Sequence, residues 1–234
     1  MVGRHDNPDR RSPFAARRPD ATYAASVATH PLDTDSFDEV LRTTRSVRRR
    51  LDFDRPIEPE VLEACIEIAT QAPTGRNAEN WRFLIITHPD KKLAIAELYR
   101  RALANLVSSR RLEAKATQQA LADRLHEMPA LILVCSEGRP PDQIAGQVGF
   151  YGSIMPAAWS LMLALRARGI GSTWTSLHML FESETAEILG IPDDVTQTIL
   201  LPVGYTRDAV LKPADRKPPH EVTYWNGWGQ QRES

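Results

Sequence analysis

Apolar positions along the chain follow two periods, one typical of helices that bury a single face and one typical of short buried strands. Helical spacing recurs in five stretches, at 36–51, 59–72, 90–126, 143–168 and 182–189. Apolar runs of strand length lie at 83–86, 131–135, 169–176 and 198–203. There is no internal repeat, and at 234 residues the pattern favours one domain with a large core.

Local signals mark where several of these elements begin or break. Ser36 and Glu39 form a capping box for the first predicted helix, which would carry a cluster of arginines at its end. Pro59 suits the first turn of the second helix. Gly149 and Pro156 predict a break or kink in the apolar stretch 143–168, which we expect to be central in the core.

Residues 1–34 differ from the rest of the chain. They carry five arginines among Pro, Asp and Ala, with only scattered hydrophobic side chains. Such a segment cannot build its own core, so it is either a free tail or an arm laid on another surface. We therefore expect an N-terminal extension, 1–34, followed by a domain at 35–234 that includes a C-terminal tail rich in aromatic residues.

Charge and cysteine content bear on which partners the protein can have and on the redox state of its cysteines. The formal net charge is −1, so no global basic field attracts nucleic acid, and any cation site must be local. Cys65 and Cys135 lie in apolar runs and are expected to be reduced core residues. No apolar run of about 20 residues and no secretory signal is evident, so we expect a soluble cytoplasmic protein with no membrane partner.

The loop from Ala72 to Trp81 joins a predicted helix to a predicted strand and is rich in hydrogen-bonding groups. Gly75 would allow a positive φ, and Thr74, Arg76 and Asn77 add a hydroxyl, a cation and an amide. This loop is either a ligand cradle or a polar connection. The arginines at 45–50 have a similar alternative, a solvated basic face.

Common catalytic signatures are absent from the sequence. There is no P-loop, no dinucleotide-binding glycine motif, no zinc-protease motif, no nucleophile elbow and no CxxC pair. None of the six histidines lies three or four residues from another, so neither a metal site nor a Ser-His triad is expected. The remaining cations, amides and hydroxyls suit an anionic organic cofactor, which would then carry the chemistry.

Four short blocks, in this order and at these separations, resemble the flavin-dependent nitroreductase family. They are Arg45-Ser46-Val47-Arg48, Ala72-Pro73-Thr74-Gly75-Arg76-Asn77, Gly169-Ile170-Gly171-Ser172-Thr173-Trp174 and Leu201-Pro202-Val203-Gly204-Tyr205. The resemblance spans about residues 36–229. It implies an α+β sandwich with a mostly antiparallel central sheet flanked by helices, built as an intertwined homodimer that binds two FMN molecules at its interface.

The resemblance also implies roles for individual positions. Arg45, Ser46 and Arg216 match residues that hold the FMN phosphate and ribityl chain, and Arg48 matches the cation beside the N1 and O2 edge of the flavin ring. A loop from the other subunit would reach the flavin through Pro73, Thr74, Gly75 and Asn77. Trp174, Thr175, Ser176 and Leu177 match the strand end whose main-chain N–H addresses flavin N5.

Three departures from the family pattern bear on the site. Many relatives have Arg at the position of Thr44, so the phosphate site either loses a ligand or uses Arg49. Trp159-Ser160 stands where relatives often have Gln-Asn, which would alter packing near the substrate. The segment 100–128, which lines the substrate entrance in relatives, matches no family pattern, and Arg124 within it is a candidate flavin contact. Arg76 and this segment are candidate contacts for the nicotinamide nucleotide or the acceptor, with an exposed surface as the alternative for each.

The sequence therefore predicts an FMN-dependent NAD(P)H oxidoreductase, a nitroreductase that takes hydride from NADPH or NADH. Transfer would be ping-pong through flavin N5 to a small planar acceptor, nitroaromatic or quinone-like. One alternative is a protein that stores or sequesters FMN without turnover. Another is an enzyme of the same fold with oxygen-dependent or dehalogenating chemistry, and the fallback without flavin is a dimeric interaction module.

Overall fold

A computed structural model describes residues 33–110 and 113–232. The chain divides into two units, 1–37 and 38–234. Of the predicted extension 1–34, only its last two residues are described; the rest lies outside the described residues. Helix α2 (Thr34–Thr43) begins here, and the side chain of Asp33 accepts a hydrogen bond from the Ser36 N–H at 3.1 Å. Asp33 thus caps this helix, and the Ser36–Glu39 capping box was a wrong prediction.

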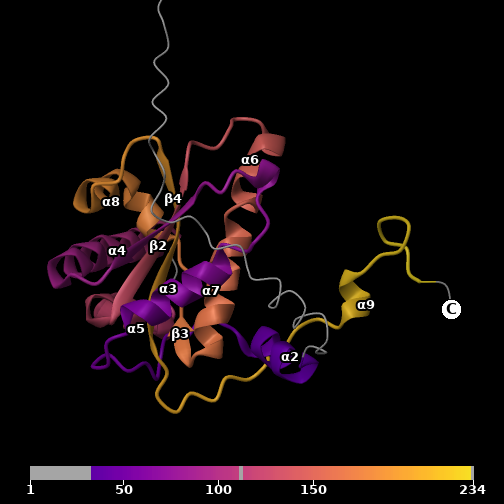
Figure 1. Cartoon of the computed structure of the whole chain (residues 1–234), viewed down its shortest axis with the longest axis horizontal. Helices are drawn as coiled ribbons and strands as arrows, with labels where there is room; N and C mark the ends of the chain where they lie inside the picture. Colours follow the sequence, from indigo (N-terminus) through magenta and orange to yellow (C-terminus); the bar gives the residue numbers. More distant parts are fainter. Residues whose placement is uncertain (1–32, 111–112, 233–234) are drawn as a thin grey trace, which may run out of the picture. The chain divides into compact units, whose positions relative to one another are not determined.

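The centre of the domain is a four-stranded sheet in the order β1-β2-β4-β3, in which every neighbouring pair is antiparallel (Figure 1). The strands are β1 (Trp81–Ile86), β2 (Ala130–Glu137), β3 (Ile170–Ser172) and β4 (Val195–Tyr205). Each contains or overlaps a stretch predicted as a strand. The mostly antiparallel sheet is therefore confirmed.

Helices cover both faces of the sheet. The helices are α3 (Pro59–Ala69), α4 (Pro89–Arg110), α5 (Ala116–Arg124), α6 (Ile144–Gly152), α7 (Met155–Ala167), α8 (Glu182–Leu189) and α9 (Pro219–Val222). In β2, Ile132 and Val134 pack with α3 and α7, whereas Leu131 and Leu133 pack with α4 and α5. This alternation follows from the two-residue period of a strand, and it gives a sandwich of helices, sheet and helices.

The first predicted helix is shorter than its apolar spacing suggested. Helix α2 ends at Thr43, and residues 44–50 are not helical. The reason is tertiary: the Val47 N–H donates to the Ser172 carbonyl at 2.9 Å, and Leu51 forms a bridge with Thr206. Both apolar side chains remain buried, but as part of a strip along β3 rather than as a helix face. The prediction of a helix over 36–51 was therefore wrong beyond Thr43.

The apolar stretch 143–168 forms two helices, α6 and α7, separated by Ser153 and Ile154. Pro156 lies in the first turn of α7, as its lack of an N–H allows. By length and mean hydropathy (1.4), Ile144–Ala167 meets the criteria for a helix able to cross a membrane, which corrects the expectation that no such stretch exists. Much of α7 is buried against α3 and the sheet, a role that such composition also serves in a protein core.

Both cysteines are buried and unpaired by a disulfide, as predicted. Burial raises the pKa of Cys135 to about 12 and also raises that of Cys65. Both thiols are therefore protonated at neutral pH, and they serve as packing groups rather than as nucleophiles.

Candidate cofactor site

The site is organised by the extended segment 44–51, which lies along the outer edge of β3. The Thr173 hydroxyl donates to the Val47 carbonyl at 2.8 Å, and this bond reinforces the main-chain bond from Val47 to Ser172. Gly171 permits the approach, because a Cβ atom there would lie 2.9 Å from Leu51 Cδ2 and 3.0 Å from Val47 Cβ. Four arginines are thereby held beside the end of β3.

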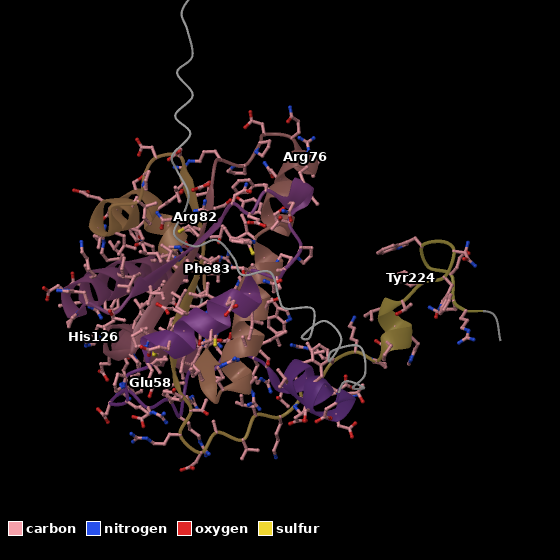
Figure 2. The ribbon with its side chains drawn as sticks, in the orientation of Figure 1. Glu58, Arg76, Arg82, Phe83, His126 and Tyr224 are labelled. Carbon is pink, nitrogen blue, oxygen red and sulfur yellow. The ribbon has the colours of Figure 1, made fainter. Side chains whose placement is uncertain are left out.

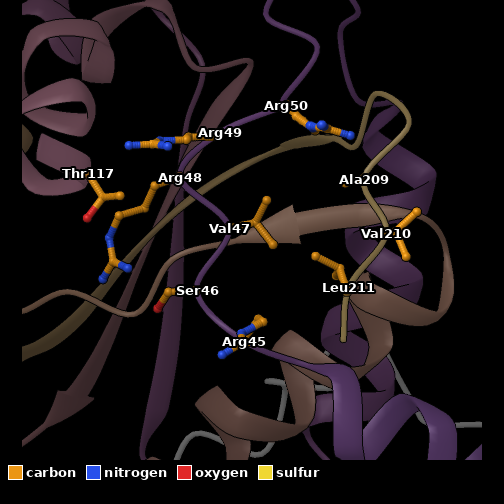
Figure 3. A pocket seen from close by; sticks show the side chains of 10 residues that line it. All are labelled: Arg45, Ser46, Val47, Arg48, Arg49, Arg50, Thr117, Ala209, Val210 and Leu211. Carbon is orange, nitrogen blue, oxygen red and sulfur yellow. The ribbon is translucent and has the colours of Figure 1, made fainter. Parts of the chain in front are cut away.

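Three cavities adjoin this segment, and they share lining residues. The first, of about 400 Å³ (Figure 3), is lined by Arg45, Ser46, Val47, Arg48, Arg49, Arg50, Thr117, Ala209, Val210 and Leu211. The second, of about 440 Å³, is lined by Arg48, Tyr99, Leu106, Gln118, Trp174, Thr175, Ser176, Leu177, Met179 and Leu180. The third, of about 370 Å³, is lined by Leu41, Arg42, Thr44, Arg45, Trp159, Pro213, Ala214 and Arg216.

Positive charge dominates these walls. Arg48 lines the first and second cavities and Arg45 lines the first and third, so the three lie in a row along the segment. Among the described residues, no Asp or Glu lines any of them. Because no carboxylate neutralises these cations, their positive electrostatic potential remains available to attract an anion. A chain with net charge −1 therefore carries a local cluster of cations, as expected from its sequence.

The end of β3 offers main-chain donors to the second cavity. The Thr175 N–H donates to the Leu200 carbonyl at 3.1 Å, and the Leu200 N–H returns a bond of 2.8 Å. Trp174 and Ser176 lie on either side of Thr175 in the chain. Among the described residues, no acceptor is found for the N–H group of Trp174 or for that of Ser176. Of the four predicted residues 174–177, Trp174 and Ser176 therefore have the N–H groups available to a ring edge.

Tyr99 of α4 is a site residue that the sequence interpretation missed. Its phenol oxygen lies 3.2 Å from Thr175 Oγ1, which also accepts a weak bond from the Leu177 N–H at 3.4 Å. Burial raises the pKa of Tyr99, and the nearby Thr175 hydrogen bond and Arg48 charge act in the opposite direction. The helical period places Tyr99 on the buried face of α4, so sequence alone indicated only a core aromatic residue.

His178 follows this strand end and is fully buried. Among the residues that the structure describes, neither ring nitrogen has a hydrogen-bond partner. Desolvation lowers the pKa of His178 to about 4. The imidazole is therefore neutral at pH 7 and has no proton to donate from a cationic form.

The loop 72–81 lies apart from the three cavities. The Gly75 N–H donates to Ser153 Oγ at 2.9 Å, so the loop packs on the α6–α7 junction of its own chain. Positive φ angles occur at Arg76, Asn77 and Glu79, not at Gly75, where one was expected. Gly75 instead provides space, since a Cβ there would lie 3.2 Å from Ser153 Oγ.

One chain thus brings together most of the predicted cofactor residues but not all. The residues that line the three cavities are Arg45, Ser46, Arg48, Trp174, Thr175, Ser176, Leu177 and Arg216. Pro73, Thr74, Gly75 and Asn77 do not, and their predicted role from the other subunit stays a prediction. Arg124 is also elsewhere: it pairs with Glu127 and stacks over Phe53.

The residues present fit FMN in three respects. Arg45 and Arg216 line one cavity, where a phosphate dianion would be neutralised. The free N–H groups of Trp174 and Ser176 suit the polar edge of a planar ring, and Leu177, Met179 and Leu180 supply apolar walls. Thr44 lines the third cavity, but its hydroxyl donates to the Val40 carbonyl at 2.6 Å and replaces no cation.

The fold and the site together define an α+β protein with an open, arginine-lined site whose residues fit a phosphate-bearing planar cofactor. Residues 41–205 match the sequence profile of the Nitroreductase family, and this match covers most of the chain. The chain therefore belongs to the Nitroreductase family, which confirms the resemblance found in its four blocks.

Its relatives differ in chemistry. An iodotyrosine deiodinase of Drosophila melanogaster is 27% identical over 215 residues, which cover 88% of this chain and 74% of the relative. A protein of Archaeoglobus fulgidus, provisionally named NADH dehydrogenase/NAD(P)H nitroreductase, is 25% identical over 176 residues, covering 73% and 85%. Among solved structures, oxidised iodotyrosine deiodinase bound to FMN and 3-iodo-L-tyrosine has a TM-score of 0.62 and 26% identity, covering 82% of this chain and 98% of that one.

Proposed function

We propose that this chain is an FMN-dependent NAD(P)H oxidoreductase that reduces flat nitroaromatic or quinone-like acceptors. The observation that carries the proposal is the row of arginine-lined cavities, free of carboxylates among the described residues, beside the unpaired N–H groups of Trp174 and Ser176. When bound, FMN supplies hydride transfer between the nicotinamide and the acceptor. The protein supplies binding, orientation and charge.

Individual residues have separable tasks in this proposal. Arg45 and Arg216 hold the phosphate at one end of the row of cavities. The Arg45 guanidinium donates a hydrogen bond of 2.6 Å to the Lys212 carbonyl, which helps to hold it in position. Arg48, half-buried between the first two cavities, places a cation beside the ring edge that becomes negative on reduction. The N–H groups of Trp174 and Ser176 orient the opposite edge. No proton-transferring side chain is required.

We also propose that two copies of the chain form the working enzyme. Residues 75–79 of the loop are exposed, and the α6 side chains Ile144 and Val148 are 79% and 68% exposed. The C-terminal tail exposes Trp228 at 92%, and its ring lies tilted beside Tyr224, with ring centroids 4.9 Å apart. Apolar side chains exposed to this extent are typical of a subunit interface. A second copy would bring the residues 73–77 to the cofactor.

Storage of FMN without turnover is supported less well. A bulky aromatic side chain that capped the ring would favour storage, and Phe150 of α6 and Trp159 of α7 are two such side chains. Trp159 lines the third cavity with Arg45 and Arg216, and Phe150 lines none of the three. Neither covers the second cavity, which leaves space for a substrate.

Reductive dehalogenation is the second candidate activity, and a specific observation favours it. Iodotyrosine deiodinase is among the relatives in sequence, and a deiodinase bound to FMN shares the fold. The same cofactor residues would serve both reactions, so only the acceptor distinguishes them. An acceptor panel that includes 3-iodotyrosine is therefore part of the test.

The test is a visible absorption spectrum of the purified protein, followed anaerobically as NADPH or NADH is added. Flavin bands that bleach with one nucleotide and return with a nitroaromatic compound or a quinone would support the oxidoreductase and identify its donor. Return only with 3-iodotyrosine would support dehalogenation. Bands that do not respond to either nucleotide would favour storage, and a colourless protein that cannot be reconstituted with FMN would refute the proposal.

A further inference from the structure

Segment 45–50 carries four arginines, of which the proposed FMN site uses Arg45 and Arg48. Arg45 contacts the Lys212 carbonyl and lines the phosphate cavity, while Arg50 donates to the Asp208 carbonyl at 2.9 Å. Arg48 faces the second cavity. Arg49 has none of these tasks, and its guanidinium makes no hydrogen bond or ion pair with any described residue.

The Arg49 side chain nevertheless has a defined position. In Figure 3, Arg48 and Arg49 extend to the side of the segment where Thr117 of α5 lies, whereas Arg50 extends towards Ala209 on the other side. The first cavity is lined by all three of these residues, Arg48, Arg49 and Thr117. They thus line a space of about 400 Å³, and Arg48 also lines the second cavity beside it.

The chemistry of these groups selects an anion. Two guanidinium groups supply charged donors, the Thr117 hydroxyl adds a neutral donor, and no described carboxylate lines the cavity to neutralise them. FMN held by Arg45, Ser46 and Arg48 would run along this cavity, and its proposed contacts leave the Arg49 guanidinium and the Thr117 hydroxyl unused. A molecule in the second cavity that carries an anionic group could place that group here.

We propose that Arg49 and Thr117 form a second anion subsite, which binds a carboxylate or phosphate of the molecule that exchanges electrons with the flavin. This proposal rests on the proposed function, because it needs FMN in the neighbouring site. The anion has two possible sources, the acceptor or the extra phosphate of NADPH. The shared chemistry is an oxyanion beside the flavin, at a distance from the phosphate of FMN itself.

The experiment compares Arg49→Gln with the unchanged, FMN-loaded protein. A matched control is Arg139→Gln, which also removes one exposed arginine but breaks an ion pair with Glu182 away from these cavities. Binding of 4-nitrobenzoate and of nitrobenzene to the oxidised protein is followed by the change in the flavin spectrum. In parallel, KM is measured for NADPH and for NADH at low and high salt.

We expect Arg49→Gln to weaken binding of one charged partner by about two- to fivefold, the range for an exposed ion pair. Loss for 4-nitrobenzoate but not nitrobenzene assigns the subsite to the acceptor, and loss for NADPH but not NADH assigns it to the donor. Either difference should shrink as salt is raised. Arg139→Gln should change neither.

Equal effects of Arg49→Gln on charged and uncharged partners, or no effect on any of them, would overturn the subsite while leaving the oxidoreductase intact. FMN content is recorded for each variant. A chain that binds no FMN before any substitution would refute the proposed function and this inference together, so the two failures are distinguishable.

Discussion

Replacing His178 with phenylalanine should remove an identifiable source of acid sensitivity from the fold. His178 is fully buried, and its two ring nitrogens lack partners among the described residues. In the unfolded chain the imidazole binds a proton below pH 6.5, whereas burial lowers the pKa in the folded chain to about 4. Between these values the unfolded state binds more protons, so the folded state loses stability as the pH falls from 6.5 to about 4.

The magnitude follows from the same pKa values. At about 1.4 kcal/mol for each pH unit across this interval, the full loss attributable to His178 is about 3 kcal/mol. Phenylalanine has a similar shape and no nitrogen to desolvate. At pH 7 the variant should therefore be at least as stable as the parent, because burial of two unpaired polar atoms is avoided.

The assay is urea unfolding of both proteins at pH 7.0, 6.0, 5.0 and 4.5, at one protein concentration and one FMN loading. Subtracting the two free energies of unfolding cancels the titration of the carboxylates that both proteins share. The advantage of His178→Phe over the parent should grow as the pH falls. A difference between the parent and His178→Phe that does not change with pH would refute the reasoning.

Three further substitutions test the site. Arg48→Ala should lower the reduction potential of bound FMN by about 20 to 60 mV, equivalent to about 1 to 3 kcal/mol for two electrons, and an unchanged potential in a spectroelectrochemical titration would contradict the role of Arg48. Arg216→Ala should weaken FMN binding about tenfold with little change in potential, and fluorescence titration measures this; normal affinity would count against Arg216. Gly171→Ala should destabilise the fold by about 1 to 3 kcal/mol, because its Cβ would meet Val47 and Leu51, and an unchanged urea midpoint would disprove that close approach.

Much of the fold could be predicted because periodicity and breakers act locally. The apolar runs at 83–86, 131–135 and 198–203 became β1, β2 and β4, and Pro59 began α3 as its fixed φ favours. Gly190 ends α8 in the left-handed region, at a φ of 69°. In each of these cases the local preference and the tertiary packing favour the same conformation.

The segment 44–51 shows where local signals fail. Its apolar spacing is compatible with a helix, but Val47 and Leu51 gain burial and main-chain hydrogen bonds by pairing with β3 and Thr206. A pairing partner some 120 to 160 residues away leaves no trace in the local pattern. The same pairing, rather than helix geometry, determines that Arg48 and Arg49 face the cavities.

Three features follow from the amino-acid order alone: the alternation of helices and strands, the local cation cluster in a chain with net charge −1, and the four blocks that mark the family. Which main-chain donors remain unpaired depends on long-range packing, because the bond between Thr175 and Leu200 forms across the sheet. The same packing also brought Tyr99 and Thr117 from distant helices to the site. Composition fixes which groups are present, whereas long-range packing fixes which of them are free to bind a ligand.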